Sequence, residues 1–140
     1  MTVRAFVDTN VFVYALGKSP YSKKVMANQL LNAVTQPVIN GQVIRELGYN
    51  LRKKAGYGEE ELREVIRQLH WDCEIMTDHE AIFLRASQLR ESLGISYWDS
   101  LIVATALAAG CDTLYSGDMQ HGQVIAGTLT IINPFRTESA

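Results

Sequence analysis

The chain has 140 residues, which is enough for one core, and we expect residues 1–140 to form one domain. With 47% hydrophobic and 20% charged residues, its composition is that of an ordinary globular protein. The formal net charge of -2 argues against a protein that coats nucleic acid through bulk positive charge, but it allows an enzyme with a local basic patch.

The sequence favours a cytoplasmic protein without membrane contact. No apolar run reaches membrane-spanning length, and no charged segment followed by an apolar one indicates a signal peptide. Cys73 and Cys111 lie far apart and lack metal-ligand spacing. Reduced thiols in a cytosolic protein are therefore the simpler interpretation.

Strands and helices are predicted to alternate along the whole chain. Buried strands are expected over 3–7, 37–40, 73–76, 112–116 and 129–132. Helical segments are expected over 11–16, 20–34, 41–55, 59–69, 79–93 and 97–109. Because such alternation is typical of βαβ units, we predict an α/β fold with a mainly parallel sheet and helices on both faces.

Capping residues mark several helix ends. Ser19 and Pro20 have the pattern of an N-cap followed by proline at the first helical position. Asp78 is expected to cap the helix that Gly94 ends. The next helix is apolar on nearly every face, which predicts a central position in the fold.

Four carboxylates occupy informative positions, two after strands, one at the start of the central helix and one beside a buried helical stripe: Asp8, Asp118, Asp99 and Glu46. Each has an ordinary structural explanation: an N-cap for Asp8, an Asx-turn for Asp118, capping-box spacing after Ser96 for Asp99, and a solvated helix position for Glu46. When each residue is considered alone, the structural explanation is preferred for Asp118, Asp99 and Glu46. For Asp8 the structural and the functional explanation are equally favoured.

Taken together, the carboxylates indicate metal chemistry. Residues just after neighbouring central strands of a doubly wound sheet share one crevice, so Asp8 and Asp118 would converge if they follow such strands. At ~4 Å and an effective dielectric of about 20, two like charges repel by ~4 kcal/mol. A fold keeps that cost where a cation offsets it or a raised pKa is useful. Oxygen ligands without His or Cys favour Mg²⁺ or Mn²⁺, which support phosphodiester hydrolysis.

The order of several short motifs resembles that of a known family. The motifs that carry the resemblance are Asp8-Thr9-Asn10, Glu46, Tyr97-Trp98-Asp99, Ser116-Gly117-Asp118 and the closing Asn133-Pro134-Phe135. Their order resembles the PIN domain, more closely the VapC-type toxins of bacterial toxin–antitoxin pairs, over nearly the whole chain. The resemblance implies a Rossmann-like three-layer α/β/α sandwich and a ribonuclease that depends on Mg²⁺ or Mn²⁺. It also implies a homodimer and an antitoxin whose C-terminal segment fills the active-site groove.

The same resemblance implies roles for individual residues. The catalytic, metal-binding carboxylates would be Asp8, Glu46, Asp99 and Asp118. Supporting polar groups that orient carboxylates or waters would be Thr9, Asn10 and Ser116. Many relatives carry an acidic residue where Gly117 stands in this chain. We therefore expect one firmly bound ion, and a second ion only with substrate.

The remaining candidates are cationic or aromatic. RNA phosphates would be contacted by the positive residues of the helix that carries Glu46: Arg45, Arg52, Lys53 and Lys54. For any one of them, a solvated helix face is the preferred explanation. His121 could donate a proton to a leaving oxygen, but as a surface-loop histidine it stays outside the predicted site. Tyr97 and Trp98 could stack on bases, yet a tryptophan beside a buried helix is more often part of the core.

These observations favour a metal-dependent endoribonuclease that hydrolyses RNA by attack of water, and the resemblance makes it the toxin of a toxin–antitoxin pair. The alternative is a PIN-like module that binds RNA or a partner without cutting, which only Gly117 favours. A phosphatase or flap nuclease with the same metal chemistry is also open, although the short chain disfavours a flap nuclease.

Overall fold

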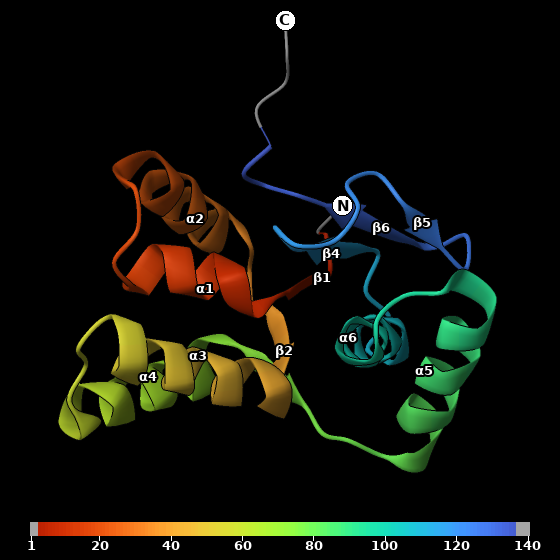
Figure 1. Ribbon diagram of the computed structural model, residues 1–140, viewed down its shortest axis with the longest axis horizontal. Coiled ribbons are helices and arrows are strands. Elements are labelled where there is room, and N and C mark those ends of the chain that lie inside the picture. The colour runs from red at the N-terminus through yellow and green to blue at the C-terminus, as the bar shows by residue number, and fades with distance from the viewer. Residues whose placement is uncertain (1–2, 137–140) are drawn as a thin grey trace, which may run out of the picture.

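The computed structural model describes residues 3–136, in which six helices flank a six-stranded sheet (Figure 1). The strands are Ala5–Val7 (β1), Val38–Asn40 (β2), Glu74–Met76 (β3), Thr113–Tyr115 (β4), Val124–Ile125 (β5) and Leu129–Ile132 (β6). The helices are Thr9–Leu16 (α1), Tyr21–Ala33 (α2), Gly41–Lys54 (α3), Glu59–Asp72 (α4), Glu80–Leu93 (α5) and Tyr97–Ala108 (α6).

The sheet is mainly parallel, as predicted. Its strand order is β3-β2-β1-β4-β6-β5, and only β5 runs antiparallel to its neighbour, β6. β1 lies between β2 and β4, with Ala5 opposite Thr113 and Val7 opposite Tyr115. The two residues of β5 were not predicted as a strand.

The helices form two layers. The chain moves across the sheet in one direction from β1 to β3 and returns in the other direction to β4. Because crossovers between parallel strands are right-handed, this reversal places α1–α4 on one face and α5–α6 on the other. α1 packs against α2 and α3, and α5 packs against α6 (Figure 1). The predicted α/β/α sandwich is therefore confirmed.

The core is centred on β1 and its neighbours. Phe6 and Val7 of β1 and Leu114 of β4 are fully buried, since these strands have helices on both faces. Ile102 and Val103 are buried in α6, as expected for a central helix. Within residues 3–136, the structure has no helix with the length and apolar character needed to cross a membrane.

Two predicted helix starts were one residue early. Pro20 occupies the N-cap position of α2, and Ser19 Oγ donates to Tyr14 O at 2.6 Å instead of capping that helix. His79 occupies the N-cap position of α5, which leaves Asp78 exposed and outside the helix. In both cases the polar residue lies one position too far from the first turn to accept its N–H groups.

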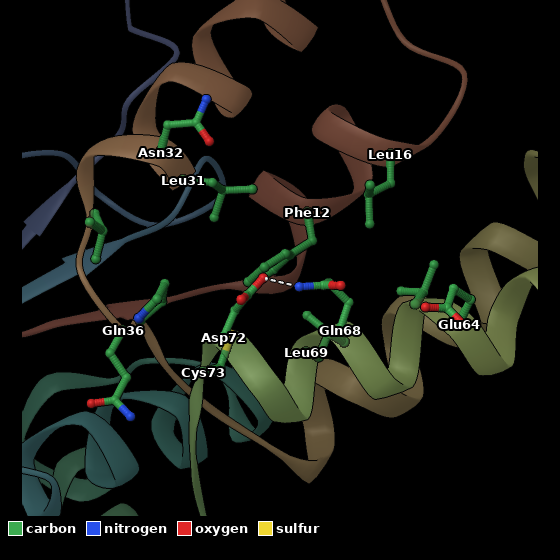
Figure 2. Close-up of a pocket in the computed structure, with 13 residues that line it drawn as sticks. Phe12, Leu16, Leu31, Asn32, Gln36, Glu64, Gln68, Leu69, Asp72 and Cys73 are labelled. Atoms are coloured by element: carbon green, nitrogen blue, oxygen red, sulfur yellow. Dashed lines mark hydrogen bonds between the residues drawn. The ribbon is translucent and has the colours of Figure 1, made fainter.

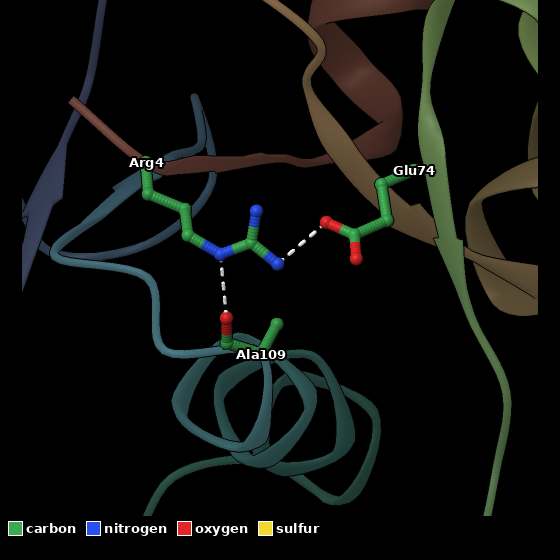
Figure 3. A network of polar contacts seen from close by, with 3 residues as sticks. All are labelled: Arg4, Glu74 and Ala109. Atoms are coloured by element: carbon green, nitrogen blue, oxygen red, sulfur yellow. Dashed lines mark hydrogen bonds and ion pairs between the residues drawn. The ribbon is translucent and has the colours of Figure 1, made fainter. Parts of the chain in front are cut away.

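Arg4 forms an ion pair and a hydrogen bond at the end of the sheet where β1 begins (Figure 3). Arg4 Nη2 forms an ion pair with Glu74 Oε2 of β3, and Arg4 Nε donates to Ala109 O, just after α6, at 2.6 Å. Arg4 therefore ties strand β3 and the end of α6 to the residue that precedes β1. About two-fifths of each charged side chain is exposed, so we expect a contribution of roughly 1 kcal/mol or less to stability.

Candidate metal centre

Asp8 and Ser116 emerge together because their strands are parallel neighbours. Val7 and Tyr115 are paired, so the next residue of each strand leaves the sheet at its carboxyl edge. The backbone N–H of Asp8 donates to Tyr115 O at 2.9 Å, and Ser116 Oγ donates to Asp8 Oδ2 at 2.9 Å. The Asp8 residue is only 7% exposed. The carboxylate is therefore held inside the edge of the sheet.

Asp8 also caps α1. Its Oδ1 accepts from the backbone N–H of Thr9 at 2.8 Å, so the structural explanation drawn from the sequence holds as well. Burial nevertheless raises the pKa of Asp8 from 3.8 to about 6, against the lowering effect of the hydrogen bonds from Thr9 and Ser116. The charges of Glu46 and Asp118 raise the pKa further. Glu46 and Asp118 are therefore near enough to Asp8 for their charges to act on its carboxyl group.

Glu46 is directed by two hydrogen bonds. Thr9 Oγ1 of α1 donates to Glu46 Oε2 at 3.1 Å, and Gln42 Nε2 donates to Oε1 at 3.0 Å. Thr9 thus has a supporting position beside a predicted acid residue. Gln42 was missed from the sequence, although its i, i+4 spacing to Glu46 on a helix was a usable signal.

Asp99 lies in the first turn of α6, within electrostatic reach of the other acids. Its backbone N–H donates to Ser96 Oγ at 3.1 Å, which is the Ser96 half of the predicted capping box. Burial raises the pKa of Asp99, the hydrogen bond with Ser96 lowers it, and the charges of Asp118 and Glu46 raise it. The carboxylate therefore faces the same negative region as Asp8.

Ser116 joins Asp8 to Asp118. While its hydroxyl donates to Asp8, the same oxygen accepts from the backbone N–H of Asp118 at 3.2 Å. The exposed Asp118 is thereby placed beside the buried acid. Glu46 and Asp118 are thus near enough to both Asp8 and Asp99 for their negative charges to raise the pKa of each.

Asn10 has one satisfied and one unsatisfied end. Its Oδ1 accepts from the Gly117 N–H at 3.1 Å, which fixes the orientation of the amide. Its Nδ2 is the one buried side-chain nitrogen or oxygen in residues 3–136 without a hydrogen-bond partner. A Cβ at Gly117 would lie 3.4 Å from that Nδ2 and 3.1 Å from Phe135 Cδ2. Any side chain at position 117 would therefore crowd Phe135 and the Asn10 amide, and one of these neighbours would have to shift.

The sequence matches the PIN domain family over residues 5–124. The chain belongs to the PIN domain family. Among curated proteins, none matches it significantly.

Several solved structures share this PIN fold. A chain of a toxin–antitoxin complex from Klebsiella pneumoniae superposes with a TM-score of 0.72 at 22% identity, over 95% of this chain and 99% of that chain. A chain of VapBC2 from Rickettsia felis, bound to a DNA fragment from its promoter, superposes with a TM-score of 0.65 at 23% identity, over 94% of this chain and 100% of that chain. VapC20 from Mycobacterium tuberculosis, a toxin that cleaves the sarcin–ricin loop, superposes with a TM-score of 0.65 at 18% identity, over 81% of this chain and 91% of that chain. At these identities the similarity shows the fold.

The donor chemistry of this PIN domain suits a hard divalent cation. The predicted ligands are all carboxylates, and oxygen donors without His or Cys fit Mg²⁺ or Mn²⁺. In the part of the chain that the structure describes, no three His, Cys, Asp or Glu side chains converge closely enough to hold an ion. Mg²⁺ is commonly bound through one or two carboxylates, with water and substrate phosphates completing the shell, and this mode does not need three convergent side chains.

Of the four cationic candidates on α3, one is already paired. Arg52 Nε lies 2.9 Å from Glu59 Oε2, and Arg52 Nη1 donates to Tyr57 O at 2.7 Å, so Arg52 fastens the turn between α3 and α4. The other three are exposed and form no ion pair within residues 3–136: Arg45, Lys53 and Lys54. They are the better candidates for contact with an anion.

The aromatic and histidine candidates also have clear positions. Tyr97 and Trp98 are 54% and 63% exposed, so the core interpretation of Trp98 is wrong. Both precede Ser100, where the buried part of α6 begins. His121 is exposed, and its Nδ1 accepts from the Asn133 N–H at 3.0 Å, which gives it a structural role.

A mainly apolar cavity of about 570 Å³ lies beside α1, α2 and α4 (Figure 2). It is lined by residues of α1, α2 and α4, among them Phe12, Leu31 and Leu69. At one side Gln68 Nε2 donates to Asp72 Oδ2 at 2.9 Å. None of the four predicted acids lines this cavity, so it is not the candidate metal centre.

Proposed function

We propose that this PIN domain is a metal-dependent endoribonuclease that hydrolyses RNA phosphodiester bonds, and that it is the toxin of a VapC-like toxin–antitoxin pair. The observation that carries the proposal is the buried Asp8 carboxylate, whose pKa is raised to about 6 beside the charges of Glu46 and Asp118. The toxin assignment is supported by similar folds in toxin–antitoxin complexes and in a toxin that cleaves the sarcin–ricin loop.

Mg²⁺ or Mn²⁺ would be held by Asp8, Glu46, Asp99 and Asp118, directly or through water. When bound, the ion supplies activation of a water molecule and stabilisation of charge on the phosphoryl oxygens. With a pKa of about 6, Asp8 is mostly ionised at neutral pH and able to bind a cation. The reaction breaks one phosphorus–oxygen bond of the RNA backbone, and a water oxygen replaces the departing ribose oxygen.

The supporting residues hold the acids in place. Ser116 fixes Asp8 and the backbone of Asp118 with one hydroxyl, and Thr9 holds Glu46 from across the helix interface. Such partners orient ligands and are commonly worth about 10- to 100-fold in affinity or activity. Lys53 and its cationic neighbours on α3 would offset the repulsion between the acid cluster and a phosphate backbone.

The enzyme activity is tested by incubating total RNA with the native chain and Mg²⁺, with the native chain and EDTA, and with an Asp8→Asn variant. We expect cleavage only in the first reaction, with a loss of more than about 100-fold in the variant, because Asp8 is a ligand and not only a supporting group. Asp112→Asn, which changes an exposed aspartate before β4, is the matched control and should cleave normally. Equal amounts of cleaved RNA with Mg²⁺, with EDTA and with Asp8→Asn would show that this chain is not the nuclease. Its function would then be to bind RNA or a partner without cutting.

The toxin role has its own test. Induced expression in bacteria should stop growth with the native chain and not with Asp8→Asn, and sequencing of RNA ends would identify the RNA that is cut. Co-expression of a cognate antitoxin should restore growth and yield a stable complex. A homodimer in the cytoplasm is the proposed state of the chain, and sedimentation velocity measures it. Normal growth during expression of the cleaving chain would contradict the toxin role.

A further inference from the structure

Two aromatic side chains are exposed at the start of α6, directly before Asp99. Tyr97 and Trp98 are 54% and 63% exposed, although both are large rings. Their rings meet edge to face, with centroids 5.1 Å apart and an angle of 79° between the planes. This geometry leaves much of the Trp98 indole open to solvent. Single exposed aromatics need no explanation, but a packed pair beside an acidic cluster does.

Arg90 of α5 holds this pair in place. Its guanidinium lies over the Tyr97 ring, 4.5 Å from the centroid, and its Nη1 donates to Ser100 Oγ at 2.8 Å. The cation therefore fixes the tyrosine ring, against which Trp98 packs. An ordered aromatic surface with a positive charge beside it suits a ligand that has flat rings and anionic links.

The position of Asp99 places this surface next to the candidate metal centre. Thr105 of α6 accepts from Asn40 at the end of β2, and Ala109 O accepts from Arg4 before β1, so α6 runs from the carboxyl edge of the sheet towards its amino edge and begins at the carboxyl edge. Trp98 precedes Asp99 directly, and consecutive Cα atoms are only about 3.8 Å apart. Trp98 is exposed in the same first turn as Asp99, so the bases next to a phosphate bound at the carboxylates would lie at the end of α6 that carries the indole. A paired base already stacks on its neighbours, whereas an unpaired base has a free face.

Resting on the proposed function, we propose that Tyr97 and Trp98 form a stacking platform for an unpaired base of the RNA substrate beside the cleaved bond. Trp98 contacts the base, Tyr97 supports the indole, and Arg90 is a positioning residue.

Binding is measured in EDTA, so that RNA is not cut, by the anisotropy of an end-labelled single-stranded oligoribonucleotide. Stacking of one base is worth about 1–3 kcal/mol, so Trp98→Ala should weaken binding roughly 5- to 150-fold. Trp98→Phe keeps a ring and should retain most of the affinity. Trp71→Ala, which removes the other tryptophan from the end of α4, is the matched control and should bind normally. A duplex of the same sequence should bind without sensitivity to Trp98→Ala.

Fluorescence gives a second readout, which loss of folding would not reproduce. In a Trp71→Phe variant, Trp98 is the only tryptophan, and single-stranded RNA should quench its emission. In a Trp98→Phe variant, the emission of Trp71 should not change.

RNA binding and cleavage without quenching of Trp98 and without an effect of Trp98→Ala would overturn the platform and leave the ribonuclease intact. Absence of both RNA binding and cleavage would overturn both proposals. Dissociation of a dimer by Trp98→Ala, with unchanged RNA affinity, would identify the surface as a contact between copies and also overturn the platform.

Discussion

Asp8→Asn separates the two roles that the structure gives to Asp8. The side chain caps α1 through the N–H of Thr9, and it carries a carboxylate with a pKa of about 6. Asparagine caps helices as well as aspartate does, so the substitution keeps the cap and removes the charge. Without divalent ions, we predict that the variant is more stable than the native chain at neutral pH and has no such advantage in acid.

The sign and size follow from the pKa of Asp8. In the folded state it is about 6, and in the unfolded state it is taken as 3.8. Between these values the folded chain binds more protons than the unfolded chain, so stability falls as the pH rises through that window and stays lower above it. The shift corresponds to about 3 kcal/mol. Loss of the bond accepted from Ser116 offsets about 1 kcal/mol, which leaves a gain of about 2 kcal/mol for the variant.

Thermal unfolding followed by circular dichroism measures this gain. With EDTA at neutral pH, we expect Asp8→Asn to raise Tm by about 7 °C, since about 1 kcal/mol corresponds to 3–4 °C for a chain of this length. At about pH 4 the difference should nearly vanish, because Asp8 is then largely protonated in the folded state. Mn²⁺ at 100 times its Kd should stabilise the native chain by about 2.7 kcal/mol and the variant by much less.

An Asp8→Asn variant that loses the same stability at both pH values would refute this reasoning. In that case Asp8 would act as a cap and as a partner of Ser116, and its charge would cost the folded state nothing. Unequal loss of helical signal between the variant and the native chain before the transition would instead point to damage at α1.

Three further predictions concern neighbouring residues. Ser116→Ala should raise the pKa of Asp8 further, because it removes a hydrogen bond that lowers this pKa, and carboxyl NMR titration would detect an unchanged or lower value if this is wrong. Lys53→Glu should weaken RNA binding and flatten its salt dependence, whereas Lys53→Arg should not, and identical salt slopes for all three proteins would remove Lys53 from the RNA contact. Calorimetric titration with Mn²⁺ should give one tight site in the native chain, since Gly117 supplies no carboxylate, and two tight sites without RNA would contradict that expectation.

The sheet and the meeting of β1 with β4 could be predicted from the sequence. In each case an apolar run ends abruptly on polar residues, as at Asp8 and Ser116, and the topology of parallel sheets then brings these ends together. Helical periodicity likewise placed Glu46 beside the buried stripe of α3. These features depend on local pattern and on a general rule of topology, both of which a single sequence carries.

Other features depend on contacts between distant residues. β5 has only two residues and forms because β6 offers it an edge, so it leaves no periodic signal. Arg52 is paired because the turn into α4 brings Glu59 beside it. Trp98 is exposed because the first turn of α6 precedes the buried part of that helix. Whether the four acids bind metal stays a prediction, since the sequence specifies their charge but not the ion.

The short outer strands limit how copies of this chain can associate. β5, at one edge of the sheet, has two residues, and β3, at the other edge, has three. A second chain that added a strand at either edge would gain only a few backbone hydrogen bonds, and short edge strands are a common protection against such pairing. Growth of the sheet from copy to copy is therefore disfavoured, and any dimer of this chain should form through helical faces instead.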